Sequence, residues 1–433
     1  MSLFGALDTA VSGLSAQSVA FGNISNNVAN SQTVGYKGVD TSFIDYLTTS
    51  TATDNEPGAV TTLPDYTNEV QGTITQSTDP LALAISGQGF FAVSEASGTT
   101  NTDQPEFSTQ QYYTRAGDFS MDSDGYLVNS AGEYLQGWTV DPSTGIANQS
   151  SLQPIQISQT QFNPVATSQV NLSANLPATP TAGSPVSSQV DVYDSLGNMH
   201  TLTLDWTQNS ANDWTVTITS PDNTPSTTIG TAEVQFGTNG VAAGTIGSFG
   251  TVTGGVAASA YGASTPASLT LSTNFGSGSQ SISLNMGDFG DADGVTQFAG
   301  TAYSLRDLSQ NGVPPGSFTG ITTTDTGAIV ANYNNGQTET VAQVPVITFA
   351  NADALQSQNG QAFTATEQSG DAIAQSESTN GAGSLVTGSV ESSNVDIATE
   401  FSKLIIAQQA YSANAKMVTT ADDMLQTTIN MKQ

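Results

Sequence analysis

Apolar side chains recur at alternating steps of four and three residues at both ends of the chain. The first series consists of Leu3, Leu7, Ala10, Leu14, Gln17, Phe21, Ile24 and Val28. The second series consists of Ile397, Phe401, Leu404, Gln408, Tyr411, Ala415, Val418, Asp422, Leu425 and Ile429. Such steps place every member of a series on one face of an α-helix. The pattern therefore predicts one helix from about Leu3 to Val28 and a second that follows Ser393.

The two predicted helices differ in intrinsic strength. The first is interrupted by Gly5, Gly13 and Gly22, each of which weakens an isolated helix by about 1 kcal/mol relative to Ala. The second contains neither Gly nor Pro, and Ser393 with Asp396 three residues later resembles a capping box. At 1.5 Å per residue this helix would be roughly 55 Å long.

Each apolar seam needs a partner, and the spacing alone allows two kinds. The helices could pair within one chain, on top of a β domain, or they could associate between copies. Two polar members of the second series, Gln408 and Asp422, can set the register and the number of partners. A narrow seam on a long terminal helix favours burial against another long helix, in the same chain or in another.

Between about residues 45 and 390 the helical period gives way to a period of two. Leu202, Leu204 and Trp206 alternate with polar residues, and Trp214, Val216 and Ile218 repeat the pattern. This alternation predicts half-buried strands. Tight turns are predicted at Asp124-Gly125, Gly197-Asn198 and Asn335-Gly336. The predicted fold class is α+β, mostly β and antiparallel, with a long helix at each end.

Stretches of small or turn-forming residues suggest boundaries within this β region. Residues 177–188 and 239–263 are rich in Gly, Ala, Ser, Thr or Pro, and residues 313–316 form a strong structure breaker. Residues 369–384 have few large apolar side chains, as expected of a connector.

Charge narrows the choice of partners. The net charge is −31, and the only basic side chains are four lysines and two arginines that do not cluster. Nucleic acids and anionic membrane surfaces are therefore not expected to bind. Residues 1–36 and 395–433 each carry a net charge of only −1. The two ends can consequently pack against further copies without strong repulsion.

No constellation in the sequence points to catalysis, a cofactor or a metal. The absence of cysteine excludes disulfides and thiolate chemistry, and the single histidine, His200, is expected at a strand edge. The segment Gly87-Gln88-Gly89 imitates a dinucleotide-binding loop but continues as a strand. Asp residues at 118, 122 and 124, and at 288, 291 and 293, precede a glycine, as in calcium loops. Because no Glu follows at the twelfth position, we interpret both groups as tight turns.

Several motifs resemble those of the rod and hook proteins of bacterial flagella. The N-terminal signature covers residues 23–37 (NISNNVANSQTVGYK), and the matching C-terminal signature covers residues 388–397 and 408–416. Residues 87–93 and 113–119 are similar to the β domain that rod and hook proteins share. Residues 192–200 (VYDSLGNMH) and 294–298 resemble motifs of the outer domain of hook proteins.

The resemblance implies a nested subunit. Residues 1–30 and 391–433 would form an axial coiled coil, and residues 31–71 with 378–390 a connector. An inner β domain would comprise residues 72–158 and 313–377, with residues 159–312 inserted as an outer β domain. The assembly interface would include Leu7, Leu14, Phe21, Ile24, Asn26, Asn27, Val28, Ile397, Phe401, Leu404, Gln408, Tyr411, Val418, Leu425 and Ile429.

The function implied by the resemblance is structural rather than enzymatic. Many copies would form a hollow, flexible tube outside the cell, joining the flagellar rod to the filament. The implied partners are the distal rod protein, the hook cap protein, the hook-filament junction protein and the flagellar type III export apparatus. Export would occur without a cleaved signal peptide, since the first residues lack a basic start and an apolar run.

Two other functions fit parts of the sequence. A distal rod protein would share both terminal signatures but would lack an outer domain. A secreted, acidic, calcium-binding adhesin would explain the β-rich middle but not the paired seams at the ends.

Overall fold

The computed structural model describes residues 3–50, 55–99, 105–141, 144–180, 186–262 and 266–431. These residues form two compact units. The first unit combines Met1–Gln159, Gly320–Asn332 and Thr338–Gln433. The second unit is built from Thr160–Thr319 together with Tyr333–Gln337. The chain is mostly β, with an α-helix near each end, as the sequence predicts.

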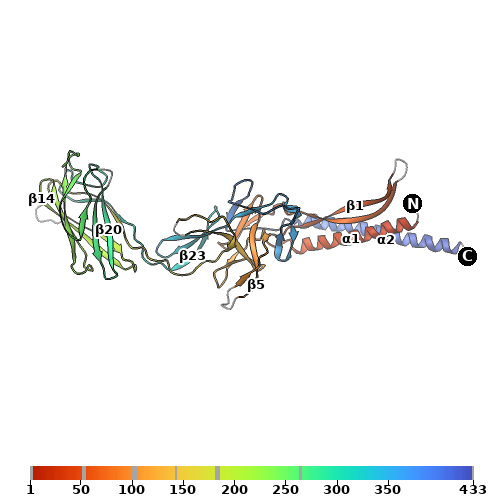
Figure 1. The fold of residues 1–433 in the computed structure, drawn as a ribbon. Coiled ribbons are helices and arrows are strands. Elements are labelled where there is room, and N and C mark those ends of the chain that lie inside the picture. The colour runs from red at the N-terminus through yellow and green to blue at the C-terminus, as the bar shows by residue number, and fades with distance from the viewer. Residues whose placement is uncertain are drawn as a thin grey trace. The chain divides into compact units, whose positions relative to one another are not determined.

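The α-helices of the described residues both belong to the first unit. α1 (Leu3–Ala29) and α2 (Ile397–Asn430) closely match the predicted spans, and they lie side by side in Figure 1. The predicted capping box is wrong, because α2 begins three residues later than Ser393 would require. Asp396 itself caps the helix, and its carboxylate accepts a hydrogen bond from Thr399 N at 2.7 Å. Neither described helix is long and apolar enough to cross a membrane.

A long hairpin follows α1 directly. β1 (Val39–Ser50) and β2 (Asn55–Tyr66) pair antiparallel, with Val39 opposite Tyr66. The hairpin runs along the helices in Figure 1. The hairpin lies in the predicted connector, and its strands begin at Val39, before the predicted start of the β region at about residue 45.

The remaining strands of the first unit form a large sheet and several short pairs. The large sheet runs in the order β23-β24-β25-β10-β5-β7-β28-β27. The strands are β3 (Ile74–Gln76), β4 (Leu83–Ser86), β5 (Phe91–Thr99), β6 (Pro105–Phe107), β7 (Tyr112–Thr114), β8 (Ser120–Met121), β9 (Leu127–Val128), β10 (Glu133–Thr139), β11 (Gln153–Pro154), β23 (Phe318–Thr323), β24 (Ala328–Tyr333), β25 (Thr338–Gln343), β26 (Val346–Thr348), β27 (Gln356–Ser357), β28 (Ala362–Thr364), β29 (Ile373–Gln375), β30 (Ser384–Thr387) and β31 (Ser389–Glu391). Short 3₁₀ helices, η1 (Ala352–Ala354) and η2 (Asn359–Gln361), lie between β26 and β28.

Aromatic side chains fill the core beneath this sheet. Phe90 packs edge-on against Phe349 and Phe363, and Tyr113 meets Phe349 at 4.9 Å between ring centroids. The segment that imitates a dinucleotide-binding loop is the turn between β4 and β5. Its glycines, Gly87 and Gly89, adopt positive φ, which favours glycine in such turns.

The second unit consists, in its described part, of facing β-sheets. One sheet runs β13-β14-β15-β16-β17, and the other runs β18-β19-β20-β12-β21 with β22 also paired to β12. The strands are β12 (Gln169–Asn175), β13 (Val186–Tyr193), β14 (Met199–Ser210), β15 (Asp213–Thr219), β16 (Thr228–Phe236), β17 (Ile246–Gly254), β18 (Val256–Ala258), β19 (Pro266–Asn274), β20 (Ser279–Asp288), β21 (Val295–Thr296) and β22 (Ser304–Gln310).

The core of the second unit follows the predicted alternation. Trp206 and Trp214 are each 1% exposed and share one hydrophobic cluster with the apolar residues that alternate on β14 and β15. The predicted turn at Gly197-Asn198 joins β13 to β14, where Tyr193 pairs with Met199. Among the described strands of this unit, β12 runs parallel to both β20 and β21, whereas the other pairs are antiparallel.

The buried carboxyl of Glu133 makes the stability of the first unit depend on pH. Burial raises the pKa of Glu133 from its ordinary value of 4.5 to about 7, against the effect of its hydrogen bond from Asn129. Between these two values the folded chain holds a proton that the unfolded chain releases. Stability therefore falls as the pH rises through this window, by at most about 3 kcal/mol.

The substitution Glu133→Gln should abolish this dependence, because an amide does not ionise. We expect a higher urea midpoint than wild type at pH 8 and an unchanged one at pH 4.5. The exposed Glu106 gives the control Glu106→Gln, for which no change is expected at either pH. A Glu133→Gln variant less stable than wild type at pH 8 would contradict the prediction.

The tryptophan core predicts that the second unit can be weakened by itself. Trp214→Ala should destabilise it by about 3–5 kcal/mol, since a large buried side chain is lost. Scanning calorimetry should show one transition moving to lower temperature, while the far-ultraviolet helix signal of α1 and α2 melts as in wild type. Thr215→Ala, which changes the neighbouring, only half-buried side chain, serves as the control. Simultaneous loss of both signals would contradict independent melting.

Candidate assembly surface

One face of α1 packs against the β1–β2 hairpin through polar and small side chains. Ala16 and Ala20 are buried on this face. The hydrogen bonds run from Thr9 Oγ1 to Gly58 O (2.9 Å), from Val60 N to Ser12 Oγ (3.1 Å) and from Asn23 Nδ2 to Thr41 Oγ1 (2.9 Å). The hairpin is therefore attached to the helix mainly by hydrogen bonds and close packing.

Asn27 completes the attachment at the end of α1. Its side chain is 2% exposed and bonds to both backbone groups of Val39, at 3.1 Å and 3.0 Å. Its amide nitrogen also donates to Glu400 Oε2 at 3.1 Å. Asn27 thus joins α1, the hairpin and α2 within one chain.

The other face of α1 meets α2, and the two helices run antiparallel. Asn27 reaches Glu400, whereas Phe21 lies edge-on to Tyr411, with ring centroids 6.3 Å apart. Further toward the N-terminus, a Cβ on Gly13 would lie 2.8 Å from the side-chain nitrogen of Asn414. A side chain at position 13 would therefore require the side chain of Asn414 to move.

The face of α2 toward α1 differs in part from the predicted seam. Glu400, Ala407 and Ala421 are buried on it, and the half-buried residues are chiefly Leu404, Val418 and Leu425. These last three belong to the predicted series, as does the half-buried Ala415, and the remaining members of the series on α2 are exposed.

The other members of the predicted interface fall into three groups. Ile24 is buried, and Leu7, Leu14, Phe21 and Val28 are half-buried. Asn26 is exposed and bonds to the hydroxyl of Tyr36 at 3.2 Å. The exposed members on α2 are Ile397, Phe401, Gln408, Tyr411 and Ile429.

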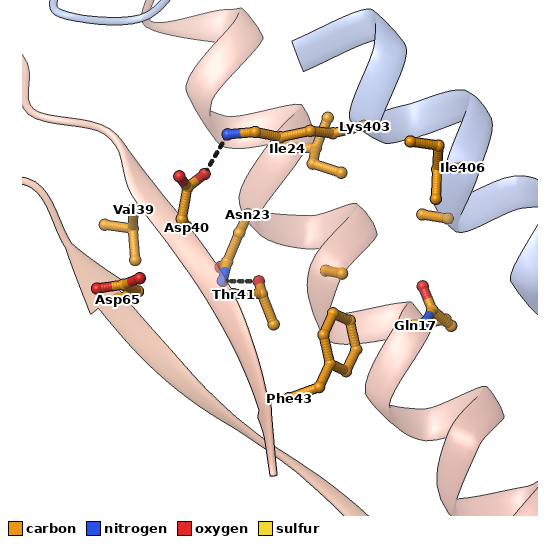
Figure 2. A pocket seen from close by; sticks show the side chains of 12 residues that line it. Gln17, Asn23, Ile24, Val39, Asp40, Thr41, Phe43, Asp65, Lys403 and Ile406 are labelled. Carbon is orange, nitrogen blue, oxygen red and sulfur yellow. Dashed lines mark hydrogen bonds and ion pairs between the residues drawn. The ribbon is translucent and has the colours of Figure 1, made fainter. Parts of the chain in front are cut away.

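An open groove lies between α1, the hairpin and α2 (Figure 2). Its volume is about 320 Å³, and it is lined by Gln17, Ala20, Asn23, Ile24, Val39, Asp40, Thr41, Phe43, Asp65, Lys403, Ile406 and Ala407. Lys403 bonds to Asp40 across it and to Glu400 Oε1 at 2.7 Å. Burial alone would lower the pKa of Lys403, but the hydrogen bonds that it donates to these carboxylates outweigh this effect and raise the pKa. The lysine therefore stays charged at the rim of the groove.

Large apolar side chains on α2 remain exposed on both sides of the contact with α1. By the helical period, Phe401 and Ile405 lie on one side, and Ile406, Met417 and Met424 on the other. Each of these side chains is more than half exposed. α2 therefore carries apolar side chains that the contact with α1 leaves uncovered.

The residues considered for chemistry have structural roles in this fold. His200 stacks on Phe275 at 4.2 Å, and its Nδ1 lies 2.9 Å from Asp222 Oδ2. Asp122 Oδ1 accepts bonds from the backbone nitrogens of Asp124 and Tyr126, which closes the turn between β8 and β9. Within the described ranges, no three His, Asp or Glu side chains are grouped closely enough to hold a metal ion.

The second aspartate-rich loop, residues 288–294, is held by an arginine. The guanidinium of Arg306 donates to the carbonyls of Ala292, at 3.0 Å, and Gly294. This cationic side chain thus binds backbone oxygens of the loop, consistent with a structural turn.

Profiles of four protein families match the chain. Residues 7–37 match "Flagella basal body rod protein", and residues 386–431 match "Flagellar basal body rod FlgEFG protein C-terminal". Residues 84–175 match "Flagellar hook protein FlgE/F/G D1 domain". Residues 163–313 match "Flagellar basal body protein FlaE D2 domain".

Curated relatives match over the full length. The flagellar hook protein FlgE of Brucella abortus is 31% identical, with all of both chains covered. The flagellar hook protein FlgE of Escherichia coli is 30% identical, over 99% of this chain and 100% of the relative. The crystal structure of Helicobacter pylori flagellar hook protein FlgE2 matches at 15% identity and a TM-score of 0.47, covering 72% of this chain and 98% of that chain. From its full-length relatives, the chain belongs to the flagellar hook protein family.

Proposed function

We propose that copies of this chain assemble side by side through α1, α2 and the groove beside them, and so build the wall of a hollow, flexible hook. The observation that carries the proposal is the exposed apolar surface on both sides of α2 in a member of a family of structural flagellar proteins. A single chain covers only one face of α2. Further copies would cover the remaining apolar side chains.

Charge supports the same arrangement. The ends of the chain carry a net charge of −1 each, whereas the residues between them carry −29. Because like charges repel, the nearly neutral helical ends can be crowded about a common axis more readily than the acidic β regions. The β regions would then face the aqueous exterior.

The residues that we propose for contacts between copies are those left exposed by the contact within the chain. On α2 these are Ile397, Phe401, Gln408, Tyr411 and Ile429 of the predicted series, together with Ile405, Ile406, Met417 and Met424. The groove beside them combines apolar Phe43 and Ile406 with the charged Asp40, Asp65 and Lys403. Such a mixed surface suits a neighbouring helix that presents both apolar and charged side chains.

We also retain the four-part division of the chain as a proposal. Residues 1–30 and 391–433 would be axial, 31–71 and 378–390 would connect, and 72–158 with 313–377 would form the inner β domain. Residues 159–312 would be the outer domain. The separation of Thr160–Thr319 as a compact unit supports this division.

The remaining parts of the proposal follow from the role of a hook. The chain would be exported by the flagellar type III apparatus without a cleaved signal peptide and would assemble outside the cell. Its neighbours would be the distal rod protein, the hook cap protein and the hook-filament junction protein. We propose no catalytic activity, because a subunit of a tube acts by binding its copies.

A distal rod protein is the nearest alternative function. The match of residues 163–313 to a separate domain profile, and the full-length match to hook proteins, favour the hook. The calcium-binding adhesin has less support, because the aspartate-rich turns are closed by hydrogen bonds of the chain itself.

The combined substitutions Phe401→Ser and Ile405→Ser should abolish polymerisation of the full chain. Both side chains are more than half exposed, so the melting temperature of the monomer should change by no more than about 2–3 °C. Sedimentation and electron microscopy would measure the polymer, and calorimetry would measure the monomer. Gln409→Ser with Thr420→Ser, on the side of α2 away from α1, is the matched control. Normal tubes from the Phe401/Ile405 variant would refute the assigned surface.

A further inference from the structure

A carboxylate with two cations lies buried where both terminal helices join the β part of the first unit. Lys37 follows α1, Glu391 ends β31 shortly before α2, and Arg115 follows β7. The side chains of all three are at most 1% exposed. Three segments that are far apart in sequence therefore meet at one charged site.

Both oxygens of the Glu391 carboxylate accept hydrogen bonds. Oε1 accepts from Lys37 Nζ at 2.6 Å and from Gly72 N at 2.7 Å. Oε2 accepts from Arg115 Nη1 at 3.0 Å. Glu391 thus connects the segment after α1, the segment after the hairpin and the inner β region.

The two cations hold further backbone on their other sides. Lys37 Nζ donates to Val70 O at 2.7 Å. The guanidinium of Arg115 donates to Ile85 O at 3.3 Å and to Gly87 O at 2.8 Å, and lies over the ring of Phe90 at 5.2 Å. The network therefore reaches from the segment after the hairpin to the turn between β4 and β5.

The backbone around these side chains is equally close. Gly35 N donates to Glu391 O at 2.8 Å. Gly35 has a φ of +69°, and a Cβ there would lie 2.3 Å from Ala116 N. Only glycine fits this position without displacing the chain beside Arg115.

Energetically, such a network is better suited to fixing geometry than to adding net stability. Removing three charges from water costs about as much as their attraction returns, so an apolar cluster of the same volume would be as stable. An apolar cluster would, however, allow the three segments to slide, because apolar contacts are not directional. Hydrogen bonds to a carboxylate fix both distance and angle.

We propose that Glu391 is the positioning residue that fixes both terminal helices to the β part of the subunit, and that it carries mechanical load between them in the hook. It acts through its ion pairs with Lys37 and Arg115. The load-bearing part rests on the proposed assembly, whereas the fixing of the helices is a property of the single chain. Neither the family resemblance nor the predicted interface includes this role.

The charges of the network predict how strongly each substitution should reduce protection from hydrogen exchange at this site. Glu391→Gln leaves two cations facing each other without an anion, whereas Lys37→Met leaves a neutral Glu391–Arg115 pair. Burial already lowers the pKa of Lys37, and Glu391 is the group that opposes this shift. The loss of protection should therefore be larger for Glu391→Gln than for Lys37→Met. The double variant with both substitutions should regain part of the protection that Glu391→Gln alone loses.

The first test is hydrogen exchange on the full-length monomer. We expect Glu391→Gln to speed exchange of the amides of Gly35 and Gly72 at least tenfold, with little change in the second unit. Lys37→Met should speed exchange at Gly35 less than Glu391→Gln does, and it covers the case in which Glu391→Gln fails to fold. Glu133→Gln is the matched control, since Glu133 is a buried carboxyl of the same unit whose side chain bonds to the nearby Asn129.

Two outcomes of this exchange experiment would overturn the proposal. One is exchange at Gly35 and Gly72 within twofold of wild type in both Glu391→Gln and Lys37→Met. The other is an equal acceleration by Glu133→Gln, which would mean that any buried carboxylate has the same effect.

The second test uses polymers grown from the same chains. Electron micrographs should show that Glu391→Gln tubes form but have a persistence length at least twofold shorter than wild type. An unchanged persistence length would refute the load-bearing role. Should wild type itself form no tubes, the proposed assembly would fail, while the exchange experiment would still decide whether Glu391 fixes the helices.

Discussion

The arrangement of the first unit depends on how closely α1 and α2 approach each other. Gly13 leaves room for Asn414, and Ala407 and Ala421 are buried on the side of α2 that faces α1. Small side chains at a helix contact bring the helix axes close but cover little area. Larger apolar residues of α2 consequently remain outside the contact. The same constraint thus explains why α1 and α2 meet and why α2 keeps large apolar side chains exposed.

The sequence was most informative where a single period governs a long segment. The extent of α1 was predicted nearly to the residue, and that of α2 to within three residues at its start, since neither segment contains a competing pattern. The alternation around Trp206 and Trp214 identified core strands correctly, because each of these strands has one buried and one exposed face. The three predicted hairpin turns also form, at β8–β9, β13–β14 and β24–β25.

The sequence was less informative where polar or small residues make the contacts. The hairpin face of α1 uses Thr9, Ser12 and Asn23, which no hydrophobic pattern can reveal. The stretch 239–263 was interpreted as a boundary, yet it contains β17 and β18 at sheet edges. Lys37 and Glu391 carry no periodic signal, and only the fold brings them together. The predicted apolar face of α2 differs in part from the face that contacts α1. The prediction followed the larger apolar side chains, whereas the contact buries the small Ala407.

The second unit has its two connecting segments bound to each other. Phe162 N donates to Gly316 O at 2.8 Å, and Val165 pairs with Val313. Because the segments that enter and leave this unit pair with each other, the residues between them can be lengthened, shortened or replaced during evolution while the two segments keep their pairing. Sequence variation within this unit can therefore accumulate without altering α1 and α2, which lie in the other unit.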